Sequence, residues 1–221
     1  MTATETLTAG TRAIIAVDGP AAAGKGTLAR RLAAALDLPY LDTGLLYRAT
    51  ARRVIDGGGD PGDAVAAEAA ARALEPGDLG RAGLRAPDTD TGASKVAAIP
   101  GVRAALLDFQ RQFGRANGAV LDGRDIGTVV FPDAPVKLFV TASLEARAER
   151  RWKERQARGE DVSLEAVTAE MAARDARDAS RDTAPMKPAG DAILLDTTAL
   201  DAEAAYAEAL RLVRQRLGLA S

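Results

Sequence analysis

Two reactive residue types are missing from this 221-residue chain, which contains neither cysteine nor histidine. The lack of cysteine excludes disulfides and thiol chemistry. The lack of histidine excludes Ser-His-Asp hydrolysis, histidine-ligated zinc and histidine acid–base catalysis. Any catalysis must therefore use Asp, Glu, Lys, Arg, Ser, Thr or backbone groups. Phosphoryl transfer needs no others, because positioning and charge neutralisation supply most of its catalysis.

Long apolar runs and a large excess of one charge are also missing. No apolar run approaches the length of a membrane span. The 29 basic and 31 acidic residues give a formal net charge of −2, which does not favour non-specific nucleic-acid binding. Residues 1–12 lack a hydrophobic signal core, so we expect a short flexible tail there. The length predicts one domain, and nothing demands an oligomer, so we expect a monomer.

The most informative segment is residues 19–27, Gly-Pro-Ala-Ala-Ala-Gly-Lys-Gly-Thr, which lies between an apolar run and an alanine- and leucine-rich helix. A phosphate-binding loop works at such a strand-to-helix turn, where backbone N–H groups and the helix N-terminus converge on one anion. Gly19 and Gly24 allow the backbone to close around phosphate, and Lys25 adds a charge for the β and γ oxygens. Glycine follows the lysine, and this Gly-Lys-Gly-Thr form is typical of nucleoside monophosphate kinases.

Apolar runs alternate with helical patterns along the chain, which predicts an α/β fold with a parallel sheet. The expected strands are residues 13–17, 39–41, 118–122, 136–140 and 192–196. The expected helices are residues 25–37, 44–56, 64–74, 101–115, 143–157, 163–176 and 201–217. Residues 76–92, which are rich in glycine and proline, are expected to be irregular.

Polar residues follow two of the expected strands, at the sheet edge where open α/β folds bind ligands. After the second strand, Thr43 can cap the next helix, and Arg48 lies within reach of a phosphate. An ordinary helix cap with a solvated arginine is the alternative. After the third strand, Arg124 and Asp125 offer a hydrogen-bond donor fork and an acceptor on one rigid loop, or else form a local salt-bridged turn. Asp122, at the end of that strand, is a candidate for orienting the ligands of Mg²⁺.

A basic helical stretch runs from Arg147 to Arg158, breaks at Gly159 and continues to Arg181. Many of its charges are expected to face solvent. Two arginine-bearing helices joined at a glycine can also form a hinged flap that brings positive charge over a transferring phosphoryl group.

These segments together resemble bacterial cytidylate kinases over residues 14–53, 94–135 and 143–196. The most specific matches are residues 24–27, 42–48, 94–103, 122–132 and 177–181. The resemblance implies a five-stranded, P-loop NTPase-type parallel sheet flanked by helices, with a CMP-binding insert and a lid. It also implies phosphoryl transfer from ATP to CMP or dCMP with Mg²⁺, in the cytoplasm, giving ADP and CDP or dCDP.

The resemblance also implies roles for individual residues. The ATP phosphates are expected on Gly19, Pro20, Ala21, Ala22, Ala23, Gly24, Lys25, Gly26 and Thr27. The CMP phosphate is expected on Thr43, Arg48, Arg124 and Arg181, cytosine on Ser94, Arg103 and Asp125, and the ribose on Arg174 and Asp178. The expected catalytic residues are Lys25 and the lid arginines Arg147, Arg150 and Arg151, with Mg²⁺ on Thr27 and, as a second candidate, Asp122.

Residues 76–92 depart from the family pattern, because many bacterial members carry a longer insert there with a small β-sheet. We expect one kinase domain with a core (12–55, 117–150 and 179–221), an NMP-binding region with a shortened insert (56–116) and a lid (151–178). Two alternatives stay open at this point. One is another small P-loop kinase, acting on UMP or on a shikimate-type acceptor. The other is a P-loop nucleotide-binding switch, although the guanine-reading Asn-Lys-x-Asp pattern is missing.

Overall fold

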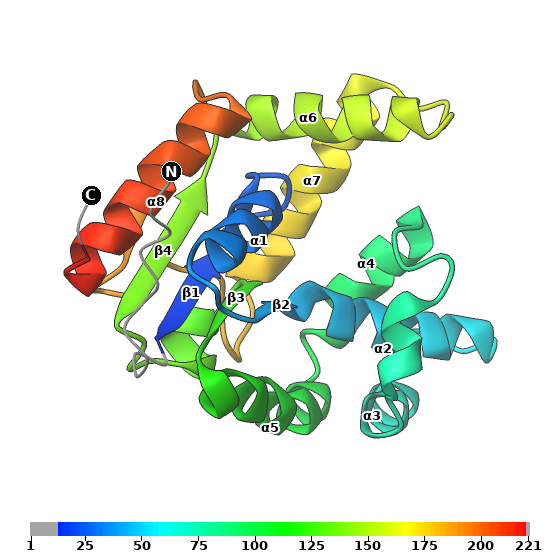
Figure 1. Ribbon diagram of the computed structural model, residues 1–221. Helices are drawn as coiled ribbons and strands as arrows, with labels where there is room; N and C mark the ends of the chain where they lie inside the picture. The colour runs from blue at the N-terminus through cyan, green and yellow to red at the C-terminus, as the bar shows by residue number, and fades with distance from the viewer. Residues whose placement is uncertain (1–12, 220–221) are drawn as a thin grey trace.

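A five-stranded parallel sheet forms the centre of the molecule, and residues 13–219 are described by the computed structural model (Figure 1). The strands are β1 (Ile14–Asp18), β2 (Tyr40–Asp42), β3 (Ala119–Gly123), β4 (Val136–Thr141) and β5 (Ile193–Asp196). Their order in the sheet is β2-β3-β1-β4-β5. All five strands predicted from the sequence are confirmed, with ends displaced by at most one residue. The predicted tail at residues 1–12 lies outside the described residues.

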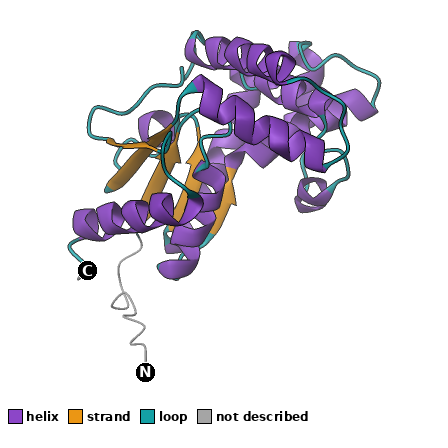
Figure 2. Cartoon of the chain, turned by 90° about the horizontal axis from the view of Figure 1, so that it is seen from above, coloured by secondary structure: helices purple, strands orange, loops and turns teal. Residues whose placement is uncertain are grey.

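Eight α-helices occur in the described part of the chain. They are α1 (Lys25–Ala35), α2 (Thr43–Asp56), α3 (Ala64–Arg72), α4 (Pro87–Val96), α5 (Pro100–Asn117), α6 (Leu144–Ala157), α7 (Leu164–Ala179) and α8 (Ala202–Leu217). Seven of them match predicted helices. Seen from above, most of the helices extend to one side of the sheet (Figure 2).

The two faces of the sheet are buried by different elements, because successive strand residues point to opposite faces. Ile15 and Val17 face α1 and α8, in a core that also contains Leu32 of α1. Ala16 faces the other side, where Leu121 and residues of the 126–134 segment pack together with α5. Two smaller apolar clusters lie outside the sheet, one among α2–α5 and one between α6 and α7.

The prediction that residues 76–92 are irregular was wrong in part. Residues Pro76–Gly80 form a 3₁₀ helix, and α4 begins at Pro87. Proline suits the first turn of a helix, where its missing N–H needs no partner. Within α4, position 92 favours glycine because a Cβ there would lie 3.0 Å from the Ala51 Cβ and 3.1 Å from the Pro61 Cγ. Close packing of α4 on α2 therefore overrides the low helix propensity of this segment.

No β-strand occurs between residues 56 and 118 of the described chain, so the prediction that residues 76–92 hold no strands is confirmed. The break predicted at Gly159 is also confirmed, because α6 ends at Ala157 and Gly159 has a φ of +79°. None of the helices built from residues 13–219 is long and apolar enough to cross a membrane.

Candidate active site

The glycine-rich loop joins β1 to α1 and leaves the N-terminus of α1 open. Gly19 has a φ of +145°, and a Cβ there would lie 1.9 Å from the Val140 carbonyl oxygen of the neighbouring strand. Gly24 (φ +85°) and Ala22 (φ +57°) are in the left-handed region. Alternation of left- and right-handed residues turns successive N–H groups toward one point, which forms an anion-binding nest. Gly24 is the N-cap of α1 and has no side chain to cap it, so the first N–H groups of the helix are available to a ligand.

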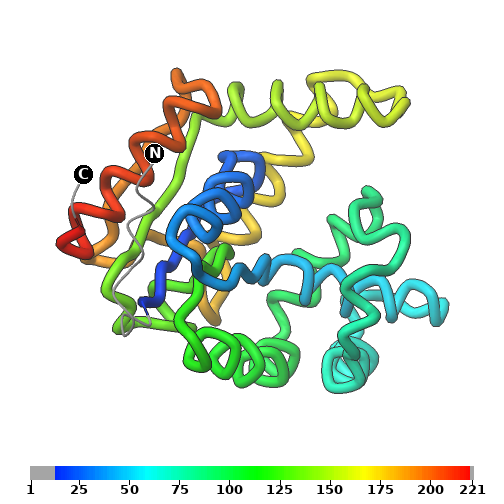
Figure 3. Tube along the Cα trace, viewed as in Figure 1, coloured from blue at the N-terminus to red at the C-terminus, as the bar shows by residue number. Residues whose placement is uncertain are grey.

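Next to this loop is a cavity of about 330 Å³, lined by residues of the 19–27 loop, α2, α4, the β3 loop, α6 and α7. Its lining includes residues of α4 and of α6 and α7, whose Cα traces face each other across a gap in Figure 3. Most predicted site residues line it: Ala21, Ala22, Gly24, Lys25, Gly26, Thr27, Thr43, Arg48, Ser94, Arg103, Asp122, Arg124, Asp125, Arg151, Arg174, Asp178 and Arg181. Segments far apart in the sequence therefore contribute to one site.

Lys25 lies at the start of α1, and its ammonium is held among cations and carboxylates. Burial and the charge of Arg124 lower the pKa of Lys25 to about 7, against the opposing effects of Asp122 and Asp42. Its Nζ lies 3.5 Å from the carbonyl oxygen of Pro20. An added negative charge stabilises the ammonium form of a lysine and raises its pKa. Phosphate oxygens at this position would therefore restore the protonated form of Lys25.

Asp178 lies at the centre of an arginine-rich cluster in the wall of the cavity, and it is almost completely buried. Its Oδ2 accepts a hydrogen bond from Arg124 Nε at 3.1 Å, and its Oδ1 accepts one from Arg181 Nη2 and one from the Ser94 hydroxyl at 3.1 Å. Burial alone would raise the pKa of Asp178, but the arginines outweigh it and hold the pKa below its usual range. This carboxylate thus orients two arginines and a serine from three parts of the chain.

Two donors in this cluster lack partners. The Nε atoms of Arg174 and Arg181 are buried and have no hydrogen-bond partner among residues 13–219. A buried donor without a partner costs about 1–3 kcal/mol, so native structures rarely keep one without reason. Both arginines line the cavity, and an oxygen-rich ligand bound there could satisfy them.

Arg103 of α5 and Asp125 of the β3 loop form a buried ion pair on the same side. Burial raises the pKa of Asp125, while the nearby Arg103 opposes that shift. The Arg103 guanidinium lies 5.8 Å from the centre of the Tyr47 ring. Arg103 also donates to the Ala97 carbonyl oxygen at 3.4 Å. The pair therefore provides a fixed donor fork and a fixed acceptor at the wall of the cavity.

Comparison with known proteins identifies the family of this chain. The profile of the cytidylate kinase family matches residues 15–215. The chain is 63% identical to the cytidylate kinase of Acidiphilium cryptum over 204 residues, which cover 92% of this chain and 96% of the relative. It is also 63% identical to the cytidylate kinase of Granulibacter bethesdensis over 205 residues, or 93% and 98% of the two chains. The chain belongs to the cytidylate kinase family.

The fold is also similar to that of a solved structure with a distant sequence, a crystal structure of an uncharacterized protein from Eubacterium ventriosum. The TM-score is 0.55 at 13% identity, covering 94% of this chain and 99% of the other.

Among cytidylate kinases, the Acidiphilium cryptum protein is no longer than this chain, since 204 aligned residues cover 96% of it. The insert of this chain is therefore not short relative to that member of the family.

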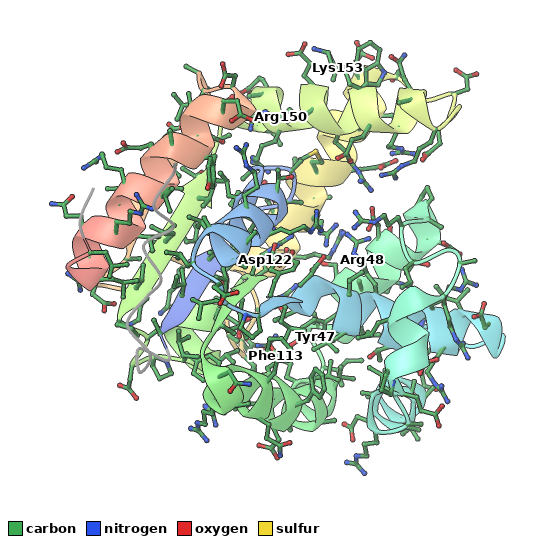
Figure 4. All side chains as sticks on the ribbon, in the orientation of Figure 1. Tyr47, Arg48, Phe113, Asp122, Arg150 and Lys153 are labelled. Carbon is green, nitrogen blue, oxygen red and sulfur yellow. The ribbon has the colours of Figure 1, made fainter. Side chains whose placement is uncertain are left out.

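Two of the three predicted lid arginines lie outside the cavity lining. Arg150 donates to the Thr197 hydroxyl at 3.1 Å and to the Thr197 carbonyl at 2.6 Å, near the end of α6 that faces α8 (Figure 4). Arg147 pairs with Asp175 at 2.7 Å and donates to the Ala21 carbonyl at 3.3 Å. These arginines hold parts of the core and the glycine-rich loop together. Of the residues predicted to hold the ATP phosphates, Gly19, Pro20 and Ala23 are also absent from the cavity lining.

The two residues predicted to bind Mg²⁺ have the chemistry that this ion requires. Thr27 and Asp122 both line the cavity, and they offer a hydroxyl and a carboxylate, which are the hard oxygen ligands that Mg²⁺ prefers. The Asp122 Oδ1 lies 3.3 Å from the Tyr40 hydroxyl, whereas its Oδ2 lies next to Gly26, where a Cβ would be only 3.2 Å away. No cluster of three or more acidic groups suited to a metal occurs within residues 13–219, so substrate phosphates would have to complete the coordination.

Two aspartates at or beside the site were missed by the sequence reasoning. Asp18, at the end of β1, accepts hydrogen bonds of 2.8 Å from the N–H groups of Ile126 and Gly127. It thereby fixes the loop that carries Asp125, and burial raises its pKa to about 7 despite these two bonds. Its place directly before the glycine-rich loop was the available signal. Asp90 of α4 also lines the cavity, but nothing in its local sequence marks it.

Proposed function

We propose that this member of the cytidylate kinase family transfers the γ-phosphoryl group of ATP to the 5′-phosphate of CMP or dCMP, giving ADP and CDP or dCDP. One observation carries the proposal: a single cavity joins the glycine-rich loop and Lys25 to an acceptor side built on Asp178 and on the Arg103–Asp125 pair. A hydrolase or a switch protein would not need the arginine-rich half of this cavity.

In the proposed complex, the N–H groups of the glycine-rich loop and Lys25 hold the β- and γ-phosphates of ATP. Thr43, Arg48, Arg124 and Arg181 hold the acceptor phosphate, and Arg174 and Asp178 hold the ribose hydroxyls. The Thr43 hydroxyl already donates to the Asp122 carbonyl at 2.7 Å, which fixes its position at the start of α2. Because phosphate oxygens only accept hydrogen bonds, this role requires the hydroxyl proton to be redirected from the Asp122 carbonyl to the phosphate.

Cytosine recognition follows from donor and acceptor types. The exocyclic amine of cytosine is a donor and matches the Asp125 carboxylate, whereas N3 and O2 are acceptors and match Arg103 and Ser94. Because Asp125 and Arg103 already pair with each other, the base would bind to their remaining oxygen and N–H groups. Uracil presents the opposite pattern at two of these positions and would leave buried groups unsatisfied.

The reaction needs no protein acid or base. An oxygen of the acceptor phosphate forms a bond to the γ-phosphorus while the bond from that phosphorus to the β-γ bridging oxygen breaks, and ADP keeps the electron pair. Lys25 and Arg151 neutralise the charge on the transferring group, and closure of the lid excludes water that would otherwise hydrolyse ATP. When bound, Mg²⁺ would be held by Thr27 and Asp122 and would neutralise part of the negative charge of the phosphates.

We further propose that the chain is one kinase domain with a core, an NMP-binding region at 56–116 and a lid at 151–178. The separate apolar clusters of α2–α5 and α6–α7 support the presence of an NMP-binding part and a lid, because each has a small core outside the sheet. Helix α2, which the division assigns to the core, contributes to the first cluster. A monomeric state and a cytoplasmic location remain predictions from the sequence.

The test is ADP release by the purified protein with ATP, Mg²⁺ and each of CMP, dCMP, UMP, AMP, GMP and shikimate. We expect CMP and dCMP to have the highest kcat/KM, UMP to be lower, and the purine nucleotides and shikimate to be far lower. ATP turnover that needs no acceptor would support the switch protein instead. Equal kcat/KM values for CMP and AMP would contradict cytosine recognition by Ser94, Arg103 and Asp125.

A further inference from the structure

Asp90 joins two arginines that come from opposite sides of the cavity. It lies on α4, and its Oδ1 accepts a hydrogen bond from Arg48 of α2, while its Oδ2 accepts one from Arg151 of α6. The three side chains are between 13% and 20% exposed, so each can be reached from the cavity that they line. No other carboxylate of the described residues pairs with both of these arginines.

The chemistry of this contact matches that of a bound phosphate. A carboxylate and a phosphate are both anions whose oxygens accept pairs of guanidinium N–H bonds. Around Asp90, two guanidinium groups converge on one anion with one oxygen for each. Their other contacts are weaker: Arg48 also donates to the Leu84 carbonyl at 3.2 Å, and Arg151 to the exposed Glu154 at 2.9 Å.

The surroundings are rich in positive charge. Burial and the charge of Arg174 lower the pKa of Arg48 to about 9, with further contributions from Arg151 and Arg124 that outweigh Asp42. Crowded cations of this kind are stabilised by an anion among them. In the absence of substrate, Asp90 supplies that anion from the protein itself.

We propose that Asp90 competes with substrate phosphate for Arg48 and Arg151, and that it thereby sets the affinity of the enzyme for its nucleoside monophosphate. In the proposed function Arg48 binds the acceptor phosphate and Arg151 the phosphoryl group that is transferred to it. This inference rests on the proposed function, since it takes these arginines to be the ones that bind phosphate. Asp90 is a positioning residue: it keeps the two arginines extended into the cavity and gives them up when the substrate arrives. A dianionic phosphate and a carboxylate on the same arginines repel each other, so Asp90 must turn away.

The proposal predicts a gain of affinity on mutation, whereas the loss of a merely structural contact would weaken binding. Asp90→Asn keeps the shape of the side chain but removes its charge. We expect the Kd of CMP, measured by calorimetry, to fall about threefold to tenfold, the range of one or two partly exposed ion pairs. KM for CMP should fall by a similar factor without a rise in kcat.

Three further titrations identify the group that Asp90 competes with. Inorganic phosphate should bind the Asp90→Asn variant more tightly than the wild type, by a factor similar to that for CMP. Cytidine, which has the base and ribose but no phosphate, should bind both proteins equally. Asp90→Glu, which retains the charge, should bind CMP within about twofold of the wild type.

Asp88 of the same helix provides the matched control. It also carries one negative charge, but its side chain is 54% exposed and pairs with Arg52 outside the cavity. Asp88→Asn should leave the Kd of CMP and of phosphate unchanged. If Kd fell equally in Asp88→Asn and Asp90→Asn, the cause would be the change in net charge and not the contacts of Asp90.

The outcomes separate this inference from the proposed function. Unchanged or weaker binding of phosphate and CMP by Asp90→Asn, or a gain for cytidine equal to that for CMP, would overturn the role of Asp90. If the wild type fails to phosphorylate CMP but Asp90→Asn still binds inorganic phosphate more tightly, the proposed acceptor is wrong and the role of Asp90 stands. Thermal unfolding of each variant verifies that the fold is intact.

Discussion

Arg103 of α5 and Asp125 of the β3 loop form an ion pair whose side chains are only 9% and 7% exposed. Both were predicted from the sequence to read cytosine, and they are bound to each other before any base arrives. Charges this deeply enclosed lose hydration, and a mutual hydrogen bond offsets that cost. The pair therefore holds an acceptor and a donor at a fixed spacing, which is the preorganisation that selective binding of a base needs.

Asp125→Asn is expected to change the base preference. The asparagine keeps an oxygen for Arg103 but can also present N–H donors, which match the O4 acceptor of uracil and not the amine of cytosine. We expect kcat/KM for CMP to fall roughly tenfold to a hundredfold, as for loss of a buried charge-assisted bond, and the UMP-to-CMP ratio to rise. An equal loss for CMP and UMP, or a similar loss of affinity for an ATP analogue, would show that Asp125 is structural.

Lys25→Ala is expected to lower the rate of phosphoryl transfer about 10²- to 10³-fold, the effect of losing one preorganised charge at a developing negative charge. The fold should remain, because among residues 13–219 the Lys25 ammonium makes a single long hydrogen bond, to the Pro20 carbonyl. The measurement is kcat for CMP phosphorylation, with circular dichroism as the control. A kcat within about threefold of the wild type would contradict the assignment of residues 19–27 as the phosphate loop.

The depressed pKa of Lys25 predicts proton uptake when ATP binds. In the ligand-free protein burial and Arg124 lower this pKa to about 7, so at pH 8 the neutral amine predominates. Phosphate oxygens favour the ammonium and raise the pKa, so the bound lysine takes up a proton, and the affinity for ATP should fall as the pH rises above about 7.

Calorimetry at pH 8 in two buffers with different ionisation enthalpies would measure this uptake. Lys25→Ala is the control, because it retains every other titrating group, including those of ATP. The wild type should take up more protons than the variant, and equal uptake by the two proteins would show that Lys25 is already charged in the free enzyme.

The sequence was sufficient for those features that depend on local chemistry. The glycine-rich loop could be recognised because its function resides in its own backbone, and the five strands were visible as short apolar runs. Helix α4 was missed because its Gly92 and its polar residues are poor helix formers, and its stability comes from packing on α2. The Asp90 contacts were missed because Arg48 and Arg151 are 42 and 61 residues away. Only the folded chain brings such charges together.

The predicted lid should respond when both substrates bind. Trp152 of α6 donates to the Val162 carbonyl at 2.9 Å and packs against Val167 and Met171 of α7, so it joins the two helices of the lid. With a bisubstrate analogue bound, we expect slower hydrogen exchange in residues 151–178 and a change in tryptophan emission, because closure excludes water. If both signals stay as in the free enzyme, residues 151–178 are not a lid.

The neighbouring arginines of α6 should have different roles, although the sequence predicted both to be catalytic. Arg151 lines the cavity, whereas Arg150 makes two hydrogen bonds to Thr197, whose hydroxyl also lies 3.1 Å from the Ala23 carbonyl of the phosphate loop. Arg151→Met should lower kcat about 10²-fold or more, because it removes a charge that acts on the transferring phosphoryl group.

Arg150→Met is the matched variant, because it removes the same charge one position earlier in the same helix. It should leave kcat within about threefold of the wild type and lower the stability by about 1–2 kcal/mol, through the loss of the Thr197 hydrogen bonds. In a chain of this size that corresponds to a Tm lower by roughly 2–8 °C. Stopped-flow measurement of the transfer step and thermal unfolding of both variants would test the assignment. A large loss of kcat in Arg150→Met at unchanged Tm would mean that Arg150 leaves Thr197 and enters the cavity when the lid closes.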